Sequence, residues 1–329
     1  MLNPCTELPS YDTPNGDNCL ATLQKEFTFI KTIGGGFWGT AALLNRHGKE
    51  IVVKMSDLTN VSLVDISVGC SLNSLRGKTG IFVHTFGWLL CDKILYIFMD
   101  HGGYSWDDKS IILSKKDAKS ILFLILHGLY VARRHLEFSH DDLHFKNILL
   151  KPISPATELI LDGGYVIKAG TTRFIPQIID FGISRTKRYR AFAEKPAEDM
   201  SRDVYMVQQL FVSRTNPDEK GIKKLKLEEE EEVVEKENLR FLEDEFFDNM
   251  DFGLAKSSRP DDWKIIYTLL QRPFFDDIVV RNQPTEIEAR CLACSGVGTM
   301  QWEHNDDHYV FCSEGCADTL APIKEFLIK

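Results

Sequence analysis

Two polar residues five positions apart mark the stretch of this chain that is best suited to chemistry. Asp142 and Asn147 lie in a loop, His140 to Leu150, that joins a long apolar segment to an apolar, strand-like run. A carboxylate can accept or orient the proton of an attacking hydroxyl, and an amide oxygen can bind a hard cation such as Mg²⁺. The spacing therefore indicates a catalytic loop that holds an acceptor hydroxyl beside a metal ion.

Upstream of this loop, a glycine-rich turn and a lysine could bind phosphate groups. Gly34, Gly36 and Gly39 follow the pattern G-x-G-x-x-G between two predicted strands, and Lys54 ends an apolar strand 20 residues after Gly34. Glycines have no Cβ atom, so their backbone N–H groups can approach phosphate oxygens closely. Each signal is weak alone, because glycine-rich hairpins are common and a lysine at a strand end can reach solvent.

Taken in order, these residues resemble the motifs of protein kinases, in particular haspin-like kinases and the kinases of large DNA viruses, over residues 26–285. The resemblance implies that Lys54 and the glycine loop position ATP, that Asp142 orients the acceptor and that Asn147 binds Mg²⁺. It also implies an α+β, bilobal protein-kinase-like fold, with a small β-rich N-lobe (26–101) and a mainly helical C-lobe (102–285). The implied ATP-binding positions are Gly34, Gly36, Gly39, Lys54, Asp65, Met99, His101 and Leu149, and the implied structural positions are His140 and Asp203.

Two Asp-Phe-Gly triplets compete for the second magnesium position of such a kinase. Asp180 follows an apolar run, 175–179, that is typical of a strand beside the catalytic loop, whereas Asp251 ends a highly acidic stretch. Too few residues follow Asp251 for the remaining helices of a kinase. We therefore assign the metal position to Asp180, and Asp203 matches the buried helix whose Asp anchors the catalytic loop.

Three positions depart from the common kinase pattern. Asp65 stands where haspin-like kinases carry Glu, and because its side chain is one methylene shorter, we expect its ion pair with Lys54 to be strained or water-bridged. Asp141 replaces the Arg that usually pairs with an activation-loop phosphate, so activity is predicted not to require that phosphorylation. His144 replaces the Lys of Ser/Thr kinases, as it does in haspin-like kinases and in small-molecule phosphotransferases of the same fold.

Periodicity and turn residues predict the elements that position these side chains. Residues 81–91 and 93–99 are predicted strands that complete a five-stranded sheet, and residues 157–173 alternate like an inserted hairpin. A capping-box pattern, Ser114 with Asp117, begins a buried helix that leads to the catalytic loop.

The segments around this core are less regular. Residues 1–25 are predicted to be an irregular leader, and residues 220–245 a charged, solvated insertion. The segment after Asp180 is short and lacks the A-P-E triplet of kinases. It is basic, which suits either an acidic substrate or a solvated loop. Its basic residues are Arg185, Lys187, Arg188 and Arg190.

Four cysteines near the C-terminus have the spacing of a zinc site. Cys291 and Cys294 form one close pair, and Cys312 and Cys316 form a second. Two such pairs can supply four thiolates to a tetrahedral Zn²⁺, so residues 286–329 are predicted to be a small zinc-binding module. The string around Cys312 resembles FCS-type and MYM/TRASH-type zinc fingers, which leaves a structural clip or protein docking as its function. The scattered cysteines, Cys5, Cys19, Cys70 and Cys91, are predicted to be reduced, buried residues.

Composition limits the classes of function. The chain of 329 residues has a net charge of −9, which argues against a dedicated nucleic-acid binder. No secretory signal is visible and the longest apolar run is too short to span a bilayer, so we expect no membrane contact and an intracellular location, cytoplasm or nucleus, in a host cell if the chain is viral. Three hypotheses remain: an ATP- and Mg²⁺-dependent Ser/Thr protein kinase, a small-molecule phosphotransferase, and a pseudokinase scaffold with a protein-docking zinc finger.

Overall fold

The computed structural model describes residues 3–5, 25–36, 39–108, 110–189, 201–215, 241–242, 246–247, 263–281, 300–304 and 307–311. The chain divides into two compact units, one made of Met1–Asp162 and Ile167–Val280 and the other of Gly163–Val166 and Arg281–Lys329. None of the helices within the described ranges is long and apolar enough to cross a membrane.

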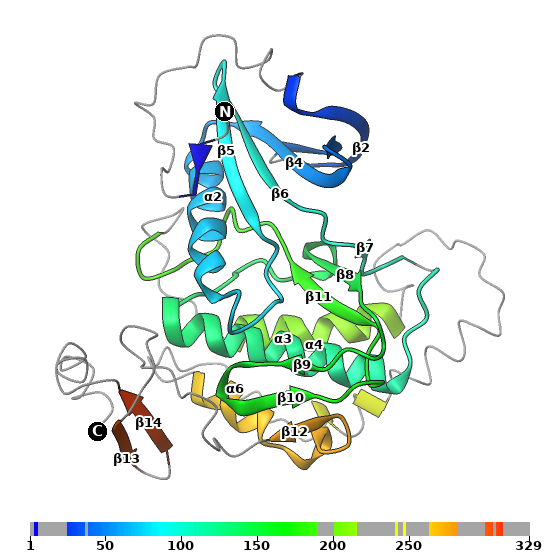
Figure 1. Ribbon diagram of the computed structural model, residues 1–329, viewed down its shortest axis with the longest axis vertical. Helices are drawn as coiled ribbons and strands as arrows, with labels where there is room; N and C mark the ends of the chain where they lie inside the picture. Colours follow the sequence, from blue (N-terminus) through cyan, green and yellow to red (C-terminus); the bar gives the residue numbers. More distant parts are fainter. Residues whose placement is uncertain are drawn as a thin grey trace. The chain divides into compact units, whose positions relative to one another are not determined.

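An antiparallel sheet of six strands forms the N-terminal part of the first unit (Figure 1). Its strand order is β1-β5-β6-β4-β3-β2. Two of its connections are two-residue turns, His47–Gly48 and Asp92–Lys93, in which both residues have positive φ. That conformation matches the twist of the paired strands. The strands are β1 (Asn3–Pro4), β2 (Thr28–Gly36), β3 (Gly39–Arg46), β4 (Lys49–Asp57), β5 (Thr85–Cys91) and β6 (Ile94–Asp100).

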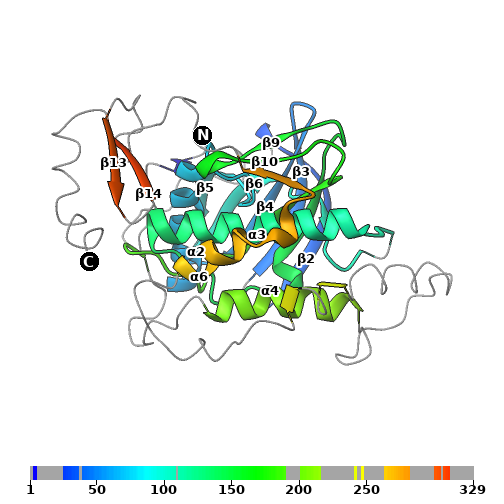
Figure 2. The ribbon, with the colours of Figure 1, turned by 90° about the horizontal axis from the view of Figure 1, so that it is seen from below.

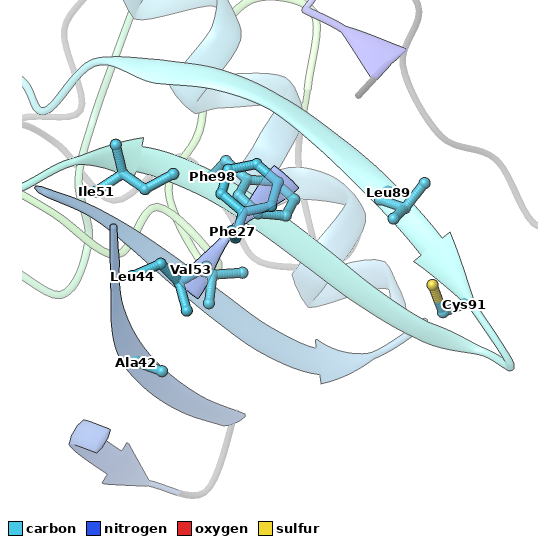
Figure 3. Packing of buried hydrophobic residues seen from close by; sticks show 8 residues of the cluster. All are labelled: Phe27, Ala42, Leu44, Ile51, Val53, Leu89, Cys91 and Phe98. Carbon is cyan, nitrogen blue, oxygen red and sulfur yellow. The ribbon is translucent and has the colours of Figure 1, made fainter. Parts of the chain in front are cut away.

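Both faces of this sheet carry buried side chains, because residues alternate between the faces along each strand. Trp88 and Leu90 of β5 pack with Ile66 of helix α2 (Asn60–Leu72). Leu89 and Cys91 of the same strand join a second cluster. This second cluster consists of Phe27, Ala42, Leu44, Ile51, Val53, Leu89, Cys91 and Phe98 (Figure 3).

The N-terminal segment contributes more than the irregular leader that was predicted. Asn3–Pro4 forms β1, a sixth strand at the edge of the sheet, and Cys5 forms a disulfide with Cys70 of α2. Cys91 is also disulfide-bonded, so the prediction of reduced thiols was wrong for these cysteines. A two-residue strand held by backbone hydrogen bonds leaves no periodic pattern, and the pairing of cysteines 65 positions apart cannot be deduced from their spacing.

The sequence pattern predicted that this strand begins at Ile81, but strand β5 begins at Thr85. The apolar residues before Thr85 pair instead with the C-terminal part of the first unit. Ile178 N donates to Ile81 O at 2.6 Å, and Val83 N donates to Ile178 O at 3.1 Å. These bonds connect the segment that enters β5 to the strand that leads to Asp180.

Helix α3 (Lys115–Leu136) is the long helix of the C-terminal part, and its predicted capping box is present: Ser114 Oγ accepts from Asp117 N at 3.1 Å, and Asp117 Oδ2 accepts from Ser114 N at 3.1 Å. The helix packs against α4 (Ser201–Thr215) and α6 (Trp263–Leu270) (Figure 2). The first unit therefore has the predicted α+β arrangement of a strand-rich part and a helix-rich part.

Short elements complete the described chain. A small sheet has the order β11-β8-β7 and carries the catalytic loop and the Asp180 triplet at its strand ends. Strands β9 and β10 flank the turn η3, as the predicted hairpin requires. The elements are η1 (Asn73–Leu75), β7 (Tyr104–Ser105), η2 (Phe145–Asn147), β8 (Ile148–Pro152), β9 (Leu159–Ile160), η3 (Asp162–Gly164), β10 (Tyr165–Ile167), β11 (Phe174–Ile178), η7 (Pro273–Phe275), β12 (Val279–Arg281), β13 (Met300–His304) and β14 (Asp307–Phe311).

Candidate active site

Lys54 of β4 lies between two carboxylates from distant parts of the chain. Its Nζ atom is 2.6 Å from Asp65 Oδ2 and 2.6 Å from Asp180 Oδ1. Burial alone would lower the pKa of Lys54, but the two carboxylates raise it above its usual range. The lysine is therefore held as a cation. The ion pair of Asp65 was expected to be strained or water-bridged, and the water-bridged alternative was wrong, because the contact is direct.

Asp180 follows β11 in a left-handed backbone conformation, with φ of 65°. Burial opposes ionisation of this carboxyl, but Lys54 holds its pKa below the usual range. The next residue, Phe181, donates its backbone N–H to Asp65 Oδ1 at 2.9 Å. The Phe181 ring is buried and lies 5.8 Å from the ring of His140. The triplet is thus fixed both by α2 and by the start of the catalytic loop.

Asp203 of α4 is fully buried beneath the catalytic loop. Its Oδ2 accepts from His140 N at 2.8 Å, and its Oδ1 accepts from Asp141 N at 3.1 Å. The His140 ring in turn lies with Nε2 3.0 Å from Ile179 O, next to Asp180. The two residues that were predicted to be structural therefore join the loop to α4 and to β11.

Asn147 ends the catalytic loop and is 5% exposed. Its Nδ2 donates to Asp142 O at 3.0 Å, so the amide oxygen is the atom that can face a cation. Ile179 N donates to Asn147 O at 3.0 Å, which brings Asn147 beside Asp180. An amide oxygen and an ionised carboxylate are ligands that fit Mg²⁺. Within the described ranges, no group of three or more His, Cys, Asp or Glu side chains could hold a metal ion.

The Asp142 carboxylate remains accessible, with 45% of its side chain exposed. His144 Nε2 lies 3.7 Å from Asp142 Oδ2 and 3.4 Å from Asn147 Nδ2. Burial lowers the pKa of His144, although the charge of Asp142 opposes this. The loop therefore exposes one carboxylate, and an imidazole lies beside it.

Three further positions that were predicted to bind nucleotide, Met99, Leu149 and His101, each have a neighbour in the structure. Met99 of β6 pairs with Val52 of β4, close to Lys54 in the sheet. Leu149 lies against the chain at Gly102, where an added Cβ would be 2.5 Å from Leu149 Cδ1. His101 lies 3.7 Å from Glu50 Oε2 and is partly exposed.

The glycine turn connects β2 to β3. Gly36 and Gly39 are paired across it, and the residues between them lie outside the described ranges. Gly39 has φ of 140°, a backbone conformation that L side chains rarely adopt, so this position requires glycine. Gly34 has open space around its Cα. Cys291, Cys294, Cys312 and Cys316, the predicted zinc ligands, also lie outside the described ranges.

Sequence reasoning missed the partners that fix the segment after the triplet. Arg185 forms an ion pair with Asp141, and its backbone exchanges two hydrogen bonds with Ser139 at 2.8 and 2.9 Å. Ser184 Oγ donates to His140 O at 3.0 Å. The opposite charges at positions 141 and 185 were the available signal, but their separation of 44 residues gave no indication that they meet.

Lys54 is held by a carboxylate of α2 and by the Asp of an Asp-Phe-Gly triplet. The neighbouring loop carries an exposed Asp and a buried Asn. This combination defines the protein kinase class. The chain belongs to the haspin-like kinase domain family, whose family model matches residues 50–234.

Curated relatives support this membership. The chain is 33% identical over 156 residues to a probable kinase of Invertebrate iridescent virus 3, covering 45% of this chain and 29% of the relative. It is 35% identical over 88 residues to a probable serine/threonine-protein kinase of Dictyostelium discoideum (24% and 7%), and 37% identical over 98 residues to the serine/threonine-protein kinase haspin homolog of Arabidopsis thaliana (29% and 16%). The chain thus spans less than a third of these relatives' lengths.

Among solved structures, the chain is similar to a crystallised kinase domain. The TM-score is 0.38 and the sequence identity 19%, over 50% of this chain and 52% of the other.

Proposed function

We propose that the protein is an active ATP- and Mg²⁺-dependent kinase that phosphorylates Ser and Thr hydroxyls of protein substrates. The observation that carries this proposal is the direct contact of Lys54 with both Asp65 and Asp180, at 2.6 Å each. Placing charges in a partly buried site costs desolvation free energy, and apolar side chains there are often at least as stable. A scaffold that had lost catalysis would therefore be under no constraint to keep this charged arrangement.

In the proposed reaction, the acceptor oxygen forms a bond to the γ-phosphorus of ATP, and the bond from that phosphorus to the β,γ-bridging oxygen breaks to release ADP. Asp142 orients the hydroxyl and takes its proton. Lys54 and the glycine turn bind the phosphates. Asn147 and Asp180 would hold Mg²⁺, which when bound neutralises developing charge on the phosphate oxygens. Positioning and electrostatics supply most of the rate.

Activity independent of activation-segment phosphorylation is part of the same proposal. In kinases that need this phosphorylation, a cation of the catalytic loop binds the phosphate. Here the corresponding residue is Asp141, and it already binds Arg185. The segment therefore has an internal partner that needs no added phosphate.

Transfer of labelled phosphate from ATP with Mg²⁺ to a mixed panel of acidic and basic proteins tests the proposal. Asp142→Asn is expected to abolish labelling, whereas the matched control Asp92→Asn, in an exposed turn, should retain it. Acid hydrolysis should then release phosphoserine or phosphothreonine. ATP consumption without labelled protein would instead favour a small acceptor, which His144 makes the second candidate. Nucleotide binding without any turnover would favour a scaffold.

The C-terminal cysteines support a second, separate proposal, a zinc-binding module that docks a protein partner. The two cysteine pairs flank strands β13 and β14 in the sequence, and these strands form an antiparallel hairpin from Met300 paired with Phe311 to His304 paired with Asp307. Two close pairs of cysteines can supply the four thiolates of a Cys₄ zinc site.

We also propose an intracellular location.

A further inference from the structure

One face of helix α2 meets the Asp180 triplet residue by residue. Val61, Asp65 and Gly69 are four positions apart from one to the next, so they lie on the same side of the helix. Val61 lies opposite Gly182, where an added Cβ would be 2.7 Å from Val61 Cγ1. Asp65 accepts from Phe181 N.

Gly69 completes this face one helical turn further along. An added Cβ at Gly69 would be 2.6 Å from Thr85 Oγ1 and 3.4 Å from Phe181 Cδ2. Thr85 is itself buried on β5, so its side chain has little freedom to move. Glycine is a poor residue for a helix interior, so its presence here calls for a packing reason. That reason is the close approach of α2 to Phe181 and to β5.

The close approach explains how a short carboxylate can reach Lys54. Asp65 contacts Lys54 Nζ directly at 2.6 Å although it is one methylene shorter than the glutamate that the kinase resemblance implies. Its side chain is 5% exposed, and both of its oxygens are engaged. A longer side chain would have to displace either the ammonium of Lys54 or the backbone N–H of Phe181.

We propose that Gly69 and Gly182 are positioning residues that bring α2 close enough for Asp65 to act as the carboxylate partner of Lys54. The aspartate and the two glycines form one matched set, in which Glu at position 65 impairs the site instead of improving it. This inference rests on the proposed kinase function, and it adds residues that determine the geometry of the ATP-binding lysine.

The test compares Asp65→Glu and Gly69→Ala with two matched controls. Asp57→Glu adds the same methylene at an exposed position of β4, and Gly77→Ala adds a Cβ where nothing lies within 4 Å. For each protein, kcat, KM for ATP, the Kd for Mg²⁺-ATP and the melting temperature are measured. Asp65→Glu and Gly69→Ala should each lower kcat/KM for ATP by about ten-fold and weaken nucleotide binding, because overpacking moves the partners of Lys54.

A compensating variant separates positioning from general damage. Thr85 Oγ1 is the atom nearest to a Cβ at position 69, so Gly69→Ala combined with Thr85→Ala should recover most of the lost nucleotide affinity. A purely structural role for Gly69 would lower the melting temperature and the active fraction but leave KM and Kd unchanged.

Three results would overturn the inference: an Asp65→Glu variant as active as the wild type or more so, a Gly69→Ala variant with unchanged KM and Kd, or no recovery in the double variant. Failure of the proposed kinase function would look different. Wild-type protein that transfers no phosphate would refute that function, while the Kd for Mg²⁺-ATP would still rank the variants and so decide this inference.

Discussion

Arg185 and Asp141 form a two-point ion pair between the segment after the Asp180 triplet and the catalytic loop. Arg185 Nη2 donates to Asp141 Oδ1 at 2.9 Å, and Nε donates to Oδ2. Each side chain is only 12% exposed. Asp141 also accepts from Ser139 Oγ at 2.6 Å. The carboxylate thus stands where kinases of the common pattern carry a cation, and the cation stands on the segment where they carry a phosphate.

Loss of this pair should slow catalysis. Arg185→Gln leaves the Asp141 carboxylate partly buried without its cation, so we expect the free energy of unfolding to fall by about 2–3 kcal/mol and kcat to fall about ten-fold. Lys187→Gln is the matched control, because the pair of Lys187 with Glu137 is exposed and should contribute less than about 1 kcal/mol. Urea unfolding and phosphate transfer measure the two effects.

The same pair predicts that phosphorylation of the segment is not needed for activity. Protein treated with a phosphatase, and shown by mass spectrometry to carry no phosphate, should transfer label at the same initial rate as untreated protein. The physical reason is that Asp141 would repel a nearby phosphate and already has a cationic partner. A loss of activity on dephosphorylation that returns on rephosphorylation would contradict this prediction.

The disulfide between Cys5 and Cys70 should stabilise the N-terminal sheet. It ties β1 to α2 and closes a loop of 65 residues, so opening it should cost about 2–4 kcal/mol. We expect the double variant Cys5→Ser with Cys70→Ser to melt at a lower temperature than the wild type in the absence of reductant. The double variant serves better than a single one because it leaves no unpaired thiol. Equal melting temperatures for both proteins would rule out the disulfide in solution.

Acid should destabilise the fold in part through Asp162. Burial alone would raise the pKa of this carboxyl, but contacts with His135 and Lys78 lower it to about 2. A carboxyl whose pKa is lower in the folded than in the unfolded chain stabilises the fold above about pH 4, and this stabilisation is lost as the pH falls from about 4 to about 2. Because a third of the side chain is exposed, we expect an effect of only about 1 kcal/mol.

Unfolding in urea between pH 2.5 and pH 7 measures this contribution. Asp162→Asn should be less stable than the wild type at pH 7, and the difference should disappear toward the acid end of the range. Asp92→Asn, in an exposed turn, should follow the wild-type curve. A difference between Asp162→Asn and the wild type that is constant with pH would mean that the carboxylate charge is not the cause.

Local motifs carried most of what could be predicted about the site. Lys54, Asp142 and Asn147 each lie in a stretch whose residue types and spacing are informative by themselves, and the structure brings Lys54 to Asp180 across 126 residues of sequence. The direct pairing of Asp65 could not be predicted, because it depends on how closely α2 approaches β5. That distance is set by Gly69, a residue that carries no chemical group of its own.

For other features the local sequence was misleading or carried no signal. Residues 81–83 form an apolar run that suggests a continuous strand, but the backbone groups of Ile81 and Val83 bond to Ile178, a partner that no short window of sequence contains. Strand β1 is two residues long and is defined only by its pairing with Trp88 and Gly87. Both cases are tertiary pairings that override a local pattern or arise without one.

The last prediction concerns the proposed zinc module: each chain should bind one Zn²⁺. Elemental analysis of the dialysed protein should find one zinc per chain, and Cys291→Ser or Cys312→Ser should lose it because three remaining thiolates leave the tetrahedral shell incomplete. The double variant of Cys5 and Cys70 is the matched control and should keep its zinc. Thiolates must be deprotonated to bind the metal, so zinc should also be released on acidification, as a coloured chelator can report. Folded wild-type protein without stoichiometric zinc would refute the proposal of a zinc module and leave the C-terminal cysteines without an assigned role.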